Sequence, residues 1–371
     1  MGAVTQPDTR WDAPFDGPFD ADRFRTDVEA ACTAFCADQA ALLEPLGDDA
    51  ARLLAQARAA VSGGKRFRAT FCWWGFNAVA PPADETTATA LVRACASLEF
   101  LHASALVHDD YMDASDVRRG RPSTHRVFEA LHRDRGWTGP SSGYGAAAAI
   151  LLGDLLLSWS DQMLRTCGLD PSTVLAALRF FDLTRTEVVA GQFLDVSVQA
   201  RGRADVNTAM TVLRYKSAKY SIERPLHIGA ALAGAGPEMI ERLSAFGLPL
   251  GEAFQLRDDV LGVFGDPSVT GKPAGDDLRE GKRTVLVARA LEALPAADAA
   301  RLDDALGTLL TDAEVADLRG LIDKSGAREQ VEAVIAGLTE QALASLERAQ
   351  ITDAARIALG GLAAQVTQRE V

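Results

Sequence analysis

The chain lacks the features that mark nucleic-acid-binding, secreted and membrane-spanning proteins. Its 371 residues include 38 Lys and Arg against 51 Asp and Glu, a net charge of −13, whereas a nucleic-acid binder needs surplus cations to neutralise phosphates. Residues 1–20 hold four aspartates and three prolines, unlike the basic and then apolar leader of a secreted protein. No uncharged apolar run reaches the roughly 20 residues that span a bilayer. We therefore expect a cytoplasmic protein with no transmembrane segment and no nucleic-acid partner.

Cysteine is also scarce. The five cysteines are an odd number spread over apolar segments, at Cys32, Cys36, Cys72, Cys95 and Cys167. Cys32 and Cys36 could share a helix face, but no second pair is present to complete a zinc site. Because free cysteine is usually buried, the pattern predicts core thiols in a reducing cytoplasm.

Alternating β-branched patterns are almost absent, and apolar residues at helical spacing dominate from Ala21 onward. Examples of the expected helices are Thr87–Leu106, Gly145–Thr166, Ser172–Ala190, Thr208–Leu213 and Ala245–Phe264. The breaks at 62–64, 81–82, 133–143 and 234–237 are too short to be domain linkers. We predict an all-α fold in which residues 21–371 form a single helical domain, with peripheral helices at its C-terminal end. The polar arm 1–20 is expected to be disordered.

Two aspartate clusters lie within these apolar helical stretches. The first is His108-Asp109-Asp110-Tyr111-Met112-Asp113, and the second contains Asp258-Asp259. On a helix, Asp109 and Asp113 share one face with Cβ atoms about 5–6 Å apart, whereas Asp110 is turned further round. Carboxylates so close repel one another unless a cation joins them, and oxygen ligands of this kind suit Mg²⁺ bridged to phosphate oxygens. The clusters therefore predict magnesium-diphosphate chemistry.

Basic residues surround the aspartates. The segment 63–68, Gly-Gly-Lys-Arg-Phe-Arg, places three cations at an apparent helix start, where an anion could bind. His102 lies two turns before Asp109 and can point into the same space. Arg118 and Arg119 follow the first cluster and could hold phosphate through paired hydrogen bonds. Each feature alone has a plainer reading, as a solvated helix start, a core histidine or a solvated turn.

The run Gly281-Lys282-Arg283-Thr284 is not a nucleotide-binding P-loop. Five residues separate Gly275 from Gly281, an arginine follows the lysine, and no hydrophobic strand precedes it. We interpret 265–283 as a flexible loop that carries Lys272 and Lys282 towards an anion.

The order of these elements is more specific than any one of them. From Gly63 to Thr284 the chain resembles the trans-isoprenyl diphosphate synthases, and most of all the geranylgeranyl diphosphate synthases. The resemblance is carried by the segments Gly63–Arg66, Asp109–Asp113, Arg118–Gly120, Gly191–Asp195, Lys216–Ala218, Gln255–Asp259, Gly271–Lys272 and Gly281–Lys282. It implies a helical bundle around an apolar cavity, a homodimer, and Mg²⁺-dependent condensation of isopentenyl diphosphate with dimethylallyl, geranyl or farnesyl diphosphate.

The resemblance also implies a role for each matching residue. Isopentenyl diphosphate would be bound by Lys65, Arg68, His102 and Arg119. Three Mg²⁺ ions would be held by Asp109, Asp113 and Asp258, with Asp110 and Asp259 in support. The allylic diphosphate would contact Arg118, Lys216, Ser217, Gln192, Gln255, Lys272 and Lys282. Catalysis would depend most on Asp109, Asp113, Asp258, Lys216 and Arg118.

Two departures from the family pattern are visible. Gly262 occupies the fifth position of the second motif, where the family usually has aspartate, and the next acid is Asp266. We expect activity to survive, because the first two aspartates of that motif carry most of the metal binding. The C-terminal residues 368–371 lack a basic cluster that some members close over the site.

Product length should depend on the residues that precede the first motif. The residues four, five and eight positions before Asp109 are Ala105, Ser104 and Leu101, which lie on roughly the same helix face. Relatives that stop at fifteen carbons commonly carry bulky aromatics at the first two positions. Small residues here predict geranylgeranyl diphosphate, with farnesyl or longer products as the alternative. The aromatic run 71–76 could form a lower floor or could simply be core.

A terpene cyclase and a non-catalytic subunit are the alternative functions, and the sequence favours neither. A terpene cyclase would carry Asn or Asp with Ser/Thr and Glu in its second metal motif, but this chain has Asp258-Asp259 and the isopentenyl-site residues. A non-catalytic subunit of a heteromeric synthase tends to lose one aspartate motif, and both are present here.

Overall fold

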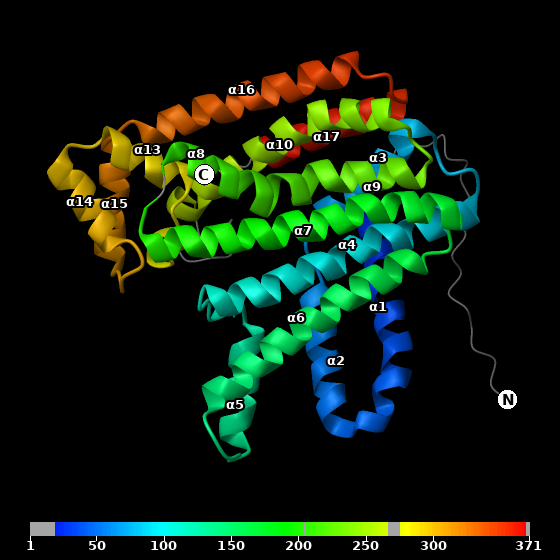
Figure 1. Cartoon of the computed structure of the whole chain (residues 1–371), viewed down its shortest axis with the longest axis horizontal. Coiled ribbons are helices and arrows are strands. Elements are labelled where there is room, and N and C mark those ends of the chain that lie inside the picture. Colours follow the sequence, from blue (N-terminus) through cyan, green and yellow to red (C-terminus); the bar gives the residue numbers. More distant parts are fainter. Residues whose placement is uncertain (1–18, 204, 266–274, 369–371) are drawn as a thin grey trace.

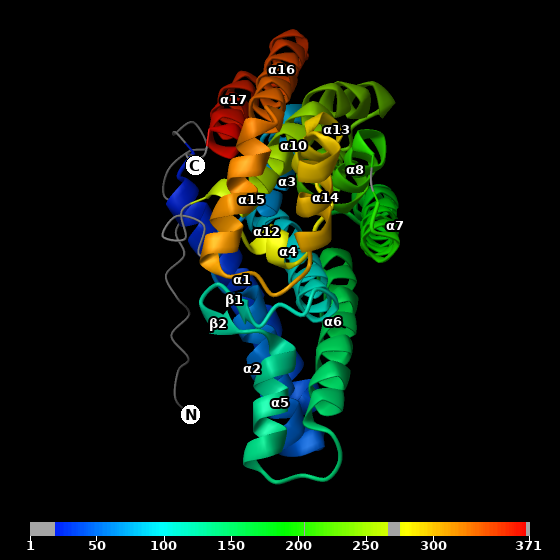
Figure 2. The same ribbon diagram turned by 90° about the vertical axis from the view of Figure 1, so that its left-hand side faces the viewer.

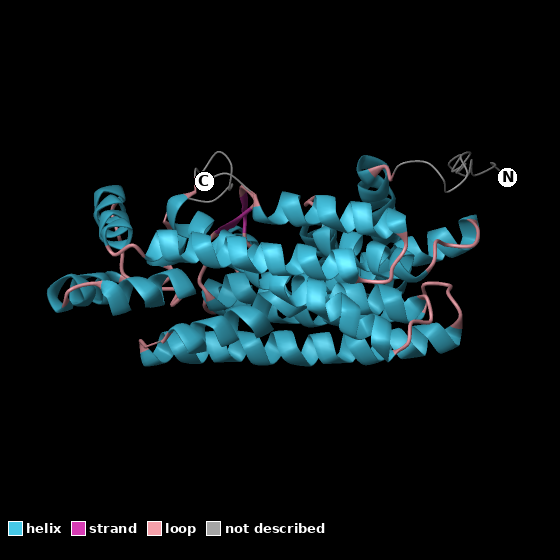
Figure 3. Cartoon of the chain, turned by 90° about the horizontal axis from the view of Figure 1, so that it is seen from above, coloured by secondary structure: helices cyan, strands magenta, loops and turns pink. Residues whose placement is uncertain are grey.

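The computed structural model describes residues 19–203, 205–265 and 275–368, and within these ranges the regular structure is almost entirely helical (Figures 1 and 3). The first helices are α1 (Ala21–Leu43), the turn η1 (Glu44–Leu46), α2 (Gly47–Val61), α3 (Phe67–Val79), α4 (Glu85–Met112), α5 (Thr124–Asp134), α6 (Ser141–Arg165) and α7 (Pro171–Arg201). They continue with α8 (Val206–Leu213), η2 (Arg214–Glu223), α9 (Arg224–Leu232), α10 (Pro237–Phe264), α12 (Asp276–Arg279), α13 (Val285–Ala293), α14 (Ala296–Ala305), α15 (Asp312–Lys324), α16 (Ala327–Arg348) and α17 (Asp353–Thr367). The predicted all-α class is confirmed.

Helix α4 is the centre of the bundle. It packs against α1, α3 and α6, which lie around it in both views (Figures 1 and 2). Leu91, Leu98, Phe100 and Leu101 are all buried within it. A helix that is apolar all round is stable only when its whole surface is covered, and the surrounding helices supply that cover.

Among the described residues, α4 and α6 are long and apolar enough to cross a membrane by length and composition alone. In α4, 78% of the apolar window is buried inside the protein, so core packing accounts for its composition. In α6 the buried share is 33%. Burial in the core therefore does not account for the apolar side chains of α6, and the expected absence of a transmembrane segment stays a prediction.

The π-helix η2 lies between α7 and α10, and glycine makes this close packing possible. A Cβ on Gly191 of α7 would lie 2.4 Å from the Lys216 nitrogen, and one on Gly251 of α10 would lie 2.5 Å from the Ala218 carbonyl oxygen. Real Cβ atoms do not approach so closely, so only glycine fits at either position. The two glycines thus fix the depth at which Lys216 and Ser217 sit in the bundle.

The last two helices, α16 and α17, pack onto the core, contrary to the expectation of a peripheral C-terminal end, whereas α14 is peripheral as expected. Helix α16 packs along α10, and α17 contacts both α3 and α10. Leu359 and Val366 of α17 are fully buried in the main core. Arg257 of α10 donates two hydrogen bonds of 2.6 Å to Glu332 of α16 and one of 3.0 Å to the Thr367 carbonyl of α17. These helices hold in place the part of α10 that carries Asp258.

The predicted breaks between helices are confirmed, and one short hairpin was not expected. Strands β1 (Val117–Arg118) and β2 (Arg121–Pro122) pair in antiparallel fashion across Arg119 and Gly120. These two residues have φ of 51° and 72°, the left-handed pair that a two-residue hairpin requires. Of the predicted arm 1–20, residues 1–18 lie outside the described part, whereas Asp20 caps α1 through its side chain.

Acid should destabilise the fold through His227. This residue is 1% exposed, contacts Arg224 at 3.0 Å and Ser244 at 2.9 Å, and burial lowers its pKa to about 3. The unfolded chain binds a proton below about pH 6.5 that the folded state refuses, so stability falls with falling pH over this window. Between pH 7 and pH 4 this one group should cost about 3 kcal/mol. Denaturant unfolding of wild type and His227→Gln at several pH values checks this, and an equally steep fall in the variant would contradict it.

Candidate active site

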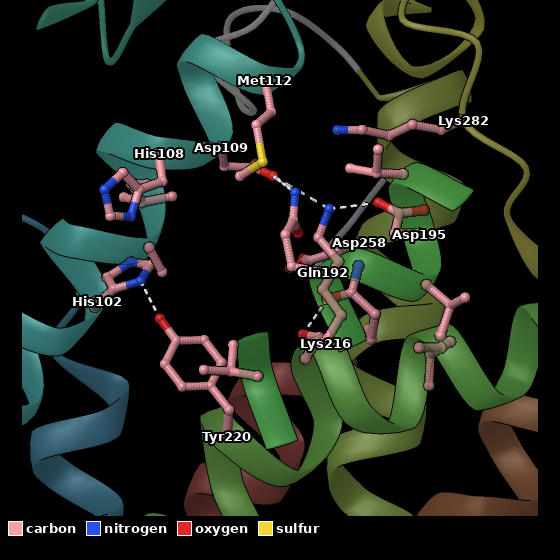
Figure 4. Close-up of a pocket in the computed structure, with 18 of the residues that line it drawn as sticks. His102, His108, Asp109, Met112, Gln192, Asp195, Lys216, Tyr220, Asp258 and Lys282 are labelled. Carbon is pink, nitrogen blue, oxygen red and sulfur yellow. Dashed lines mark hydrogen bonds and ion pairs between the residues drawn. The ribbon is translucent and has the colours of Figure 1, made fainter. Parts of the chain in front are cut away.

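A large cavity opens between α4, α6, α7, η2 and α10. Its volume is about 1280 Å³, and both aspartate motifs contribute to its wall. The predicted residues that line it are Lys65, Arg68, Leu101, His102, Ser104, Ala105, Asp109, Arg118, Arg119, Gln192, Lys216, Ser217, Gln255, Asp258, Asp259 and Lys282. Helices far apart in the sequence thus bring nearly all the predicted site residues to one space (Figure 4).

The first aspartate motif lies at the C-terminal end of α4. Asp113 is the C-cap, and its N–H donates to the Asp109 carbonyl at 2.8 Å, so both carboxylates keep their helical spacing. Asp109 lines the cavity, whereas Asp110 is buried and accepts from Arg118 Nε at 2.7 Å. Asp110 therefore orients an arginine instead of facing the cavity, whereas the sequence predicted that it supports the metal ions.

Lys216 and Gln192 hold Asp109 from the opposite wall. Lys216 Nζ lies 3.2 Å from Asp109 and 2.6 Å from Asp195, while Gln192 donates to Asp109 at 2.8 Å (Figure 4). Burial alone would raise the pKa of Asp109, but Lys216 and Lys282 outweigh it and lower the pKa below the ordinary value. Asp109 is therefore an anion, and Lys216 is a cation shared between Asp109 and Asp195 at the cavity wall.

Asp113 is in a different electrostatic position. Both of its carboxylate oxygens are buried without a hydrogen-bond partner among the described residues, and Lys282 Nζ lies 3.4 Å away. Burial and the charge of Asp109 raise the pKa of Asp113 to about 6. A buried carboxylate in this state would be stabilised by a further cation, which is what a metal ion provides.

The second motif reveals how Gly262 fits its position. A Cβ on Gly262 would lie 2.0 Å from a carboxylate oxygen of Asp277, so a side chain at the fifth position of the motif would require the Asp277 side chain to move. Asp277 lies on α12 and lines the cavity beside Asp258 and Asp259. The motif lacks an aspartate at position 262, but the carboxylate of Asp277, from the later helix α12, lies against this position.

Asp259 is held by a chain of polar side chains. Ser217 donates to Gln255, whose amide donates to Asp259 at 2.8 Å. Burial raises the pKa of Asp259 well above its ordinary value, despite this hydrogen bond, and Asp277 and Asp258 add to the effect. Both aspartates of the motif line the cavity, and Asp258, labelled in Figure 4, is the less buried of the two.

Lys282 belongs to an ordered part of the segment that we expected to be a flexible loop. Helix α12 precedes it, and its ammonium lies 2.5 Å from Glu280, 3.4 Å from Asp113 and 3.8 Å from Asp277. Burial lowers and the three carboxylates raise the pKa of Lys282, with a net result well above the ordinary value. Lys272 and Asp266 lie outside the described residues, as do residues 369–371.

A second basic group lies on the other side of the cavity. Arg68 donates to Ser221 at 2.8 Å and stacks over the ring of Tyr220 at 4.1 Å, and Arg119 donates to the Ser62 carbonyl at 3.0 Å. Lys65 completes the group at the cavity wall. The predicted cations thus separate in space into two sets, one around the aspartates and one around His102.

His102 is fixed by a residue that the sequence did not single out. Its Nδ1 lies 2.5 Å from the hydroxyl of Tyr220 (Figure 4). Burial and then Arg68 and Arg119 lower the pKa of His102 well below its ordinary value, so the ring is neutral. Burial also raises the pKa of Tyr220 to about 12, so the phenol keeps its proton and can donate it to Nδ1. The ring then presents an Nε2–H donor, which suits an anion.

The sequence reasoning also missed the carboxylates that hold the lysines in place. Asp195, Asp277 and Glu280 contact Lys216 or Lys282, and only Asp195 stood in a recognised segment. Acidic residues are frequent on helix surfaces, so no local signal separates these three from solvated ones.

Beyond Asp109 the cavity becomes apolar. Leu101, Ser104 and Ala105 line it from α4, Leu157 from α6, and Val188 from α7. Ser104 is tied back to α6 by a 2.7 Å hydrogen bond to the Gly153 carbonyl. The aromatic residues Phe71, Trp73, Trp74 and Phe76 are buried in the core and do not line this cavity, which favours the reading of this run as core packing.

Comparisons with known proteins agree with this geometry. A family model described as Polyprenyl synthetase matches residues 51–323. A geranylfarnesyl diphosphate synthase of Aeropyrum pernix is 34% identical over 262 residues, 70% of this chain and 76% of that protein. A farnesyl diphosphate synthase of Mycobacterium tuberculosis is 32% identical over 278 residues, 74% of this chain and 72% of that protein.

A solved structure gives the same assignment. The geranylgeranyl pyrophosphate synthase of Corynebacterium glutamicum, crystallised with isoprenyl diphosphate and magnesium, superimposes with a TM-score of 0.91 at 40% identity, over 95% of this chain and 100% of that one. The relatives differ in the product after which they are named, so they do not fix its length here. Together with the paired aspartates and the two sets of cations, they establish that this chain belongs to the polyprenyl synthetase family and is a trans-prenyltransferase.

Proposed function

We propose that the enzyme condenses isopentenyl diphosphate with allylic diphosphates and releases chiefly geranylgeranyl diphosphate. The observation that carries this proposal is the apolar end of the cavity, where small side chains stand directly beyond Asp109. Leu101, Leu157 and Val188 line the deeper end and would limit growth. Farnesyl or longer products are the alternative outcomes.

The aspartates fit Mg²⁺ held jointly by protein and substrate. Among the described residues no group of three His, Cys, Asp or Glu side chains forms a ready-made metal site. Mg²⁺ usually keeps several waters and binds through one or two carboxylates and substrate phosphates, so Asp109, Asp113 and Asp258 would hold it, three ions in all, together with the allylic diphosphate. When bound, the metal would supply positive charge against the leaving diphosphate.

The residues of the chain would do the remaining work. Lys216, Lys282 and Arg118 would donate hydrogen bonds to the allylic diphosphate as its bond to C1 breaks, which stabilises the developing charge. The double bond of isopentenyl diphosphate then attacks C1, and a proton leaves from the adduct to the released diphosphate. The apolar wall excludes water, which would otherwise convert the allylic cation to an alcohol.

The two sets of cations should separate kinetically. Lys65→Ala and Arg68→Ala should raise chiefly the KM for isopentenyl diphosphate, and Lys216→Ala chiefly that for the allylic substrate. Losing one charged hydrogen bond costs about 1.5–3 kcal/mol, or roughly tenfold or more. Steady-state kinetics with each substrate varied in turn measures this, and equal defects for both substrates in all three variants would remove the two-site assignment.

The same kinetics test the metal. Chelation of Mg²⁺ should abolish turnover and its return should restore it, whereas full activity of the metal-free protein would contradict the proposed mechanism. A cyclised hydrocarbon as product would instead favour a terpene cyclase.

We also propose that residues 21–371 act as one domain and that the protein is a cytoplasmic homodimer. Phe193 of α7 lines the cavity yet is 73% exposed, and Val189 one turn earlier and Leu151 of α6 are more than half exposed as well. Large exposed apolar side chains on two contacting helices are typical of a subunit interface. The five unbridged, buried thiols suit a reducing compartment.

Sedimentation of a Leu151→Asp, Phe193→Asp double variant tests the dimer. Wild type should sediment as a dimer and the variant as a monomer. Leu309→Asp is the matched control, since Leu309 is fully exposed on the α14–α15 connection. A monomeric wild type would contradict the proposed interface.

A further inference from the structure

The turn that carries Lys65 has an unusual backbone. Gly63, Gly64 and Arg66 have φ of 67°, 95° and 56°, so three of the four residues 63–66 are left-handed. This conformation is ordinary for glycine but unfavourable for a residue with a Cβ such as Arg66. Something in the surrounding structure must therefore hold Arg66 in place.

The Arg66 side chain provides the anchor. It points away from the cavity, is 3% exposed, and reaches three different helices. Its guanidinium donates to Glu99 of α4 at 2.8 Å, to the Val61 carbonyl at the end of α2 at 2.7 Å, and to Glu29 of α1. Glu29 also accepts a hydrogen bond of 3.2 Å from the Gly63 N–H, so the same carboxylate holds both ends of the turn.

The chemistry of these contacts requires arginine. A guanidinium offers five N–H groups in a rigid plane, so it can serve three acceptors in different directions at once. A lysine ammonium keeps the charge but cannot reproduce that geometry. The side chain of Glu99 is 6% exposed, so its charge depends on Arg66 for a partner.

The anchored turn stands next to the basic group around His102. Lys65 and Arg68 flank Arg66 and line the cavity, and Glu99 lies three residues before His102 on the same helix. On the other side, Arg119 donates to the Ser62 carbonyl, and its guanidinium would lie 3.1 Å from a Cβ on Gly64. The position of the turn thus affects how Lys65, Arg68 and Arg119 are placed around His102.

We propose that Arg66, through Glu99 and Glu29, is a positioning residue that sets Lys65 and Arg68 for the non-allylic substrate. It touches neither the substrate nor the reacting atoms. The inference rests on the proposed function, since that function assigns isopentenyl diphosphate to this side of the cavity.

Kinetics of Arg66→Lys with each substrate varied in turn test the proposal. The KM for isopentenyl diphosphate should rise about tenfold, in keeping with the loss of a charge-assisted geometry. The KM for the allylic substrate should stay within about twofold, since its ligands lie on other elements. Arg52→Lys is the matched control, because Arg52 on α2 pairs with Asp49 at 2.7 Å far from the turn, and its kinetics should equal those of wild type.

Glu29→Gln is the second variant, in case Arg66→Lys does not fold. The Glu29 side chain is 41% exposed, so neutralising it should be tolerated. It should raise the same KM by about two- to threefold. An unchanged KM for isopentenyl diphosphate, or equal rises for both substrates, in a variant with wild-type melting behaviour would overturn the positioning role. Failure of wild type itself to elongate allylic diphosphates would instead overturn the proposed function, so the two failures are distinguishable.

Discussion

Asp109→Ala and Asp258→Ala should each lower kcat by at least about two orders of magnitude. Each removes a carboxylate that would hold Mg²⁺, and Mg²⁺ would supply the positive charge that stabilises the leaving diphosphate. Folding should be nearly unaffected. Because Asp109 contacts Lys216 and Gln192, its removal should lower the free energy of unfolding slightly.

Asp113→Asn should leave the free energy of unfolding unchanged or raise it, since the pKa of Asp113 is raised to about 6. Turnover at saturating Mg²⁺ and melting curves measure both effects.

Asp38→Ala is the matched control, because Asp38 is an exposed aspartate on α1. It should retain wild-type turnover and melting temperature. If the purified Asp109 or Asp258 variant kept full activity, the assignment of the two motifs to the reaction would be wrong. If the variants were inactive only because they were unfolded, the melting curves would reveal it.

Ala105→Tyr should shorten the product to fifteen carbons. Ala105 lines the cavity just beyond Asp109, and a phenol there would fill the space that a twenty-carbon chain needs. Ser104→Phe should act in the same direction. Ser104 is buried and bonded to the Gly153 carbonyl, however, so the larger ring also strains the packing of α4 on α6. Leu101→Phe, deeper in the cavity, should shorten the product less. Chromatography of the dephosphorylated products gives the chain lengths.

Ala105→Ser is the control for this series, since it changes polarity with little change in volume. It should leave the product length as in wild type. An active Ala105→Tyr enzyme with unchanged product length would show that the growing chain does not run past Ala105.

The sequence predicts the fold class well because helical spacing of apolar residues is a local signal. Helices α4 and α7 are longer than predicted but lie where the periodicity of the sequence places them. The role of α16 and α17 could not be predicted, since the bonds from Arg257 to Glu332 and Thr367 join residues remote in the chain. The hairpin of Arg118 and Arg119 is only two residues per strand, too short for a periodic pattern.

The site is predictable to the extent that its residues stand in ordered motifs. Asp109, Lys216 and Asp258 belong to such motifs, and the structure brings them to one cavity. Tyr220 and Arg66 were not predicted, although each is adjacent to or within a recognised segment. Their roles depend on partners far along the chain, His102 for one and Glu99 for the other.

Gly262 shows the limit of motif comparison most clearly. In the sequence it is a missing aspartate, with Asp266 as the nearest replacement. In the structure the carboxylate of Asp277 lies against it. This carboxylate belongs to a residue that no spacing rule would select, because only the fold brings α12 onto the end of α10.

The most direct measurement is a set of three incubations of the purified chain with Mg²⁺ and isopentenyl diphosphate. Each incubation contains one primer: dimethylallyl, geranyl or farnesyl diphosphate. The proposed function predicts that all three primers are extended and that a linear twenty-carbon diphosphate accumulates as the chief product. No elongation of any primer by the folded, magnesium-loaded protein would contradict it.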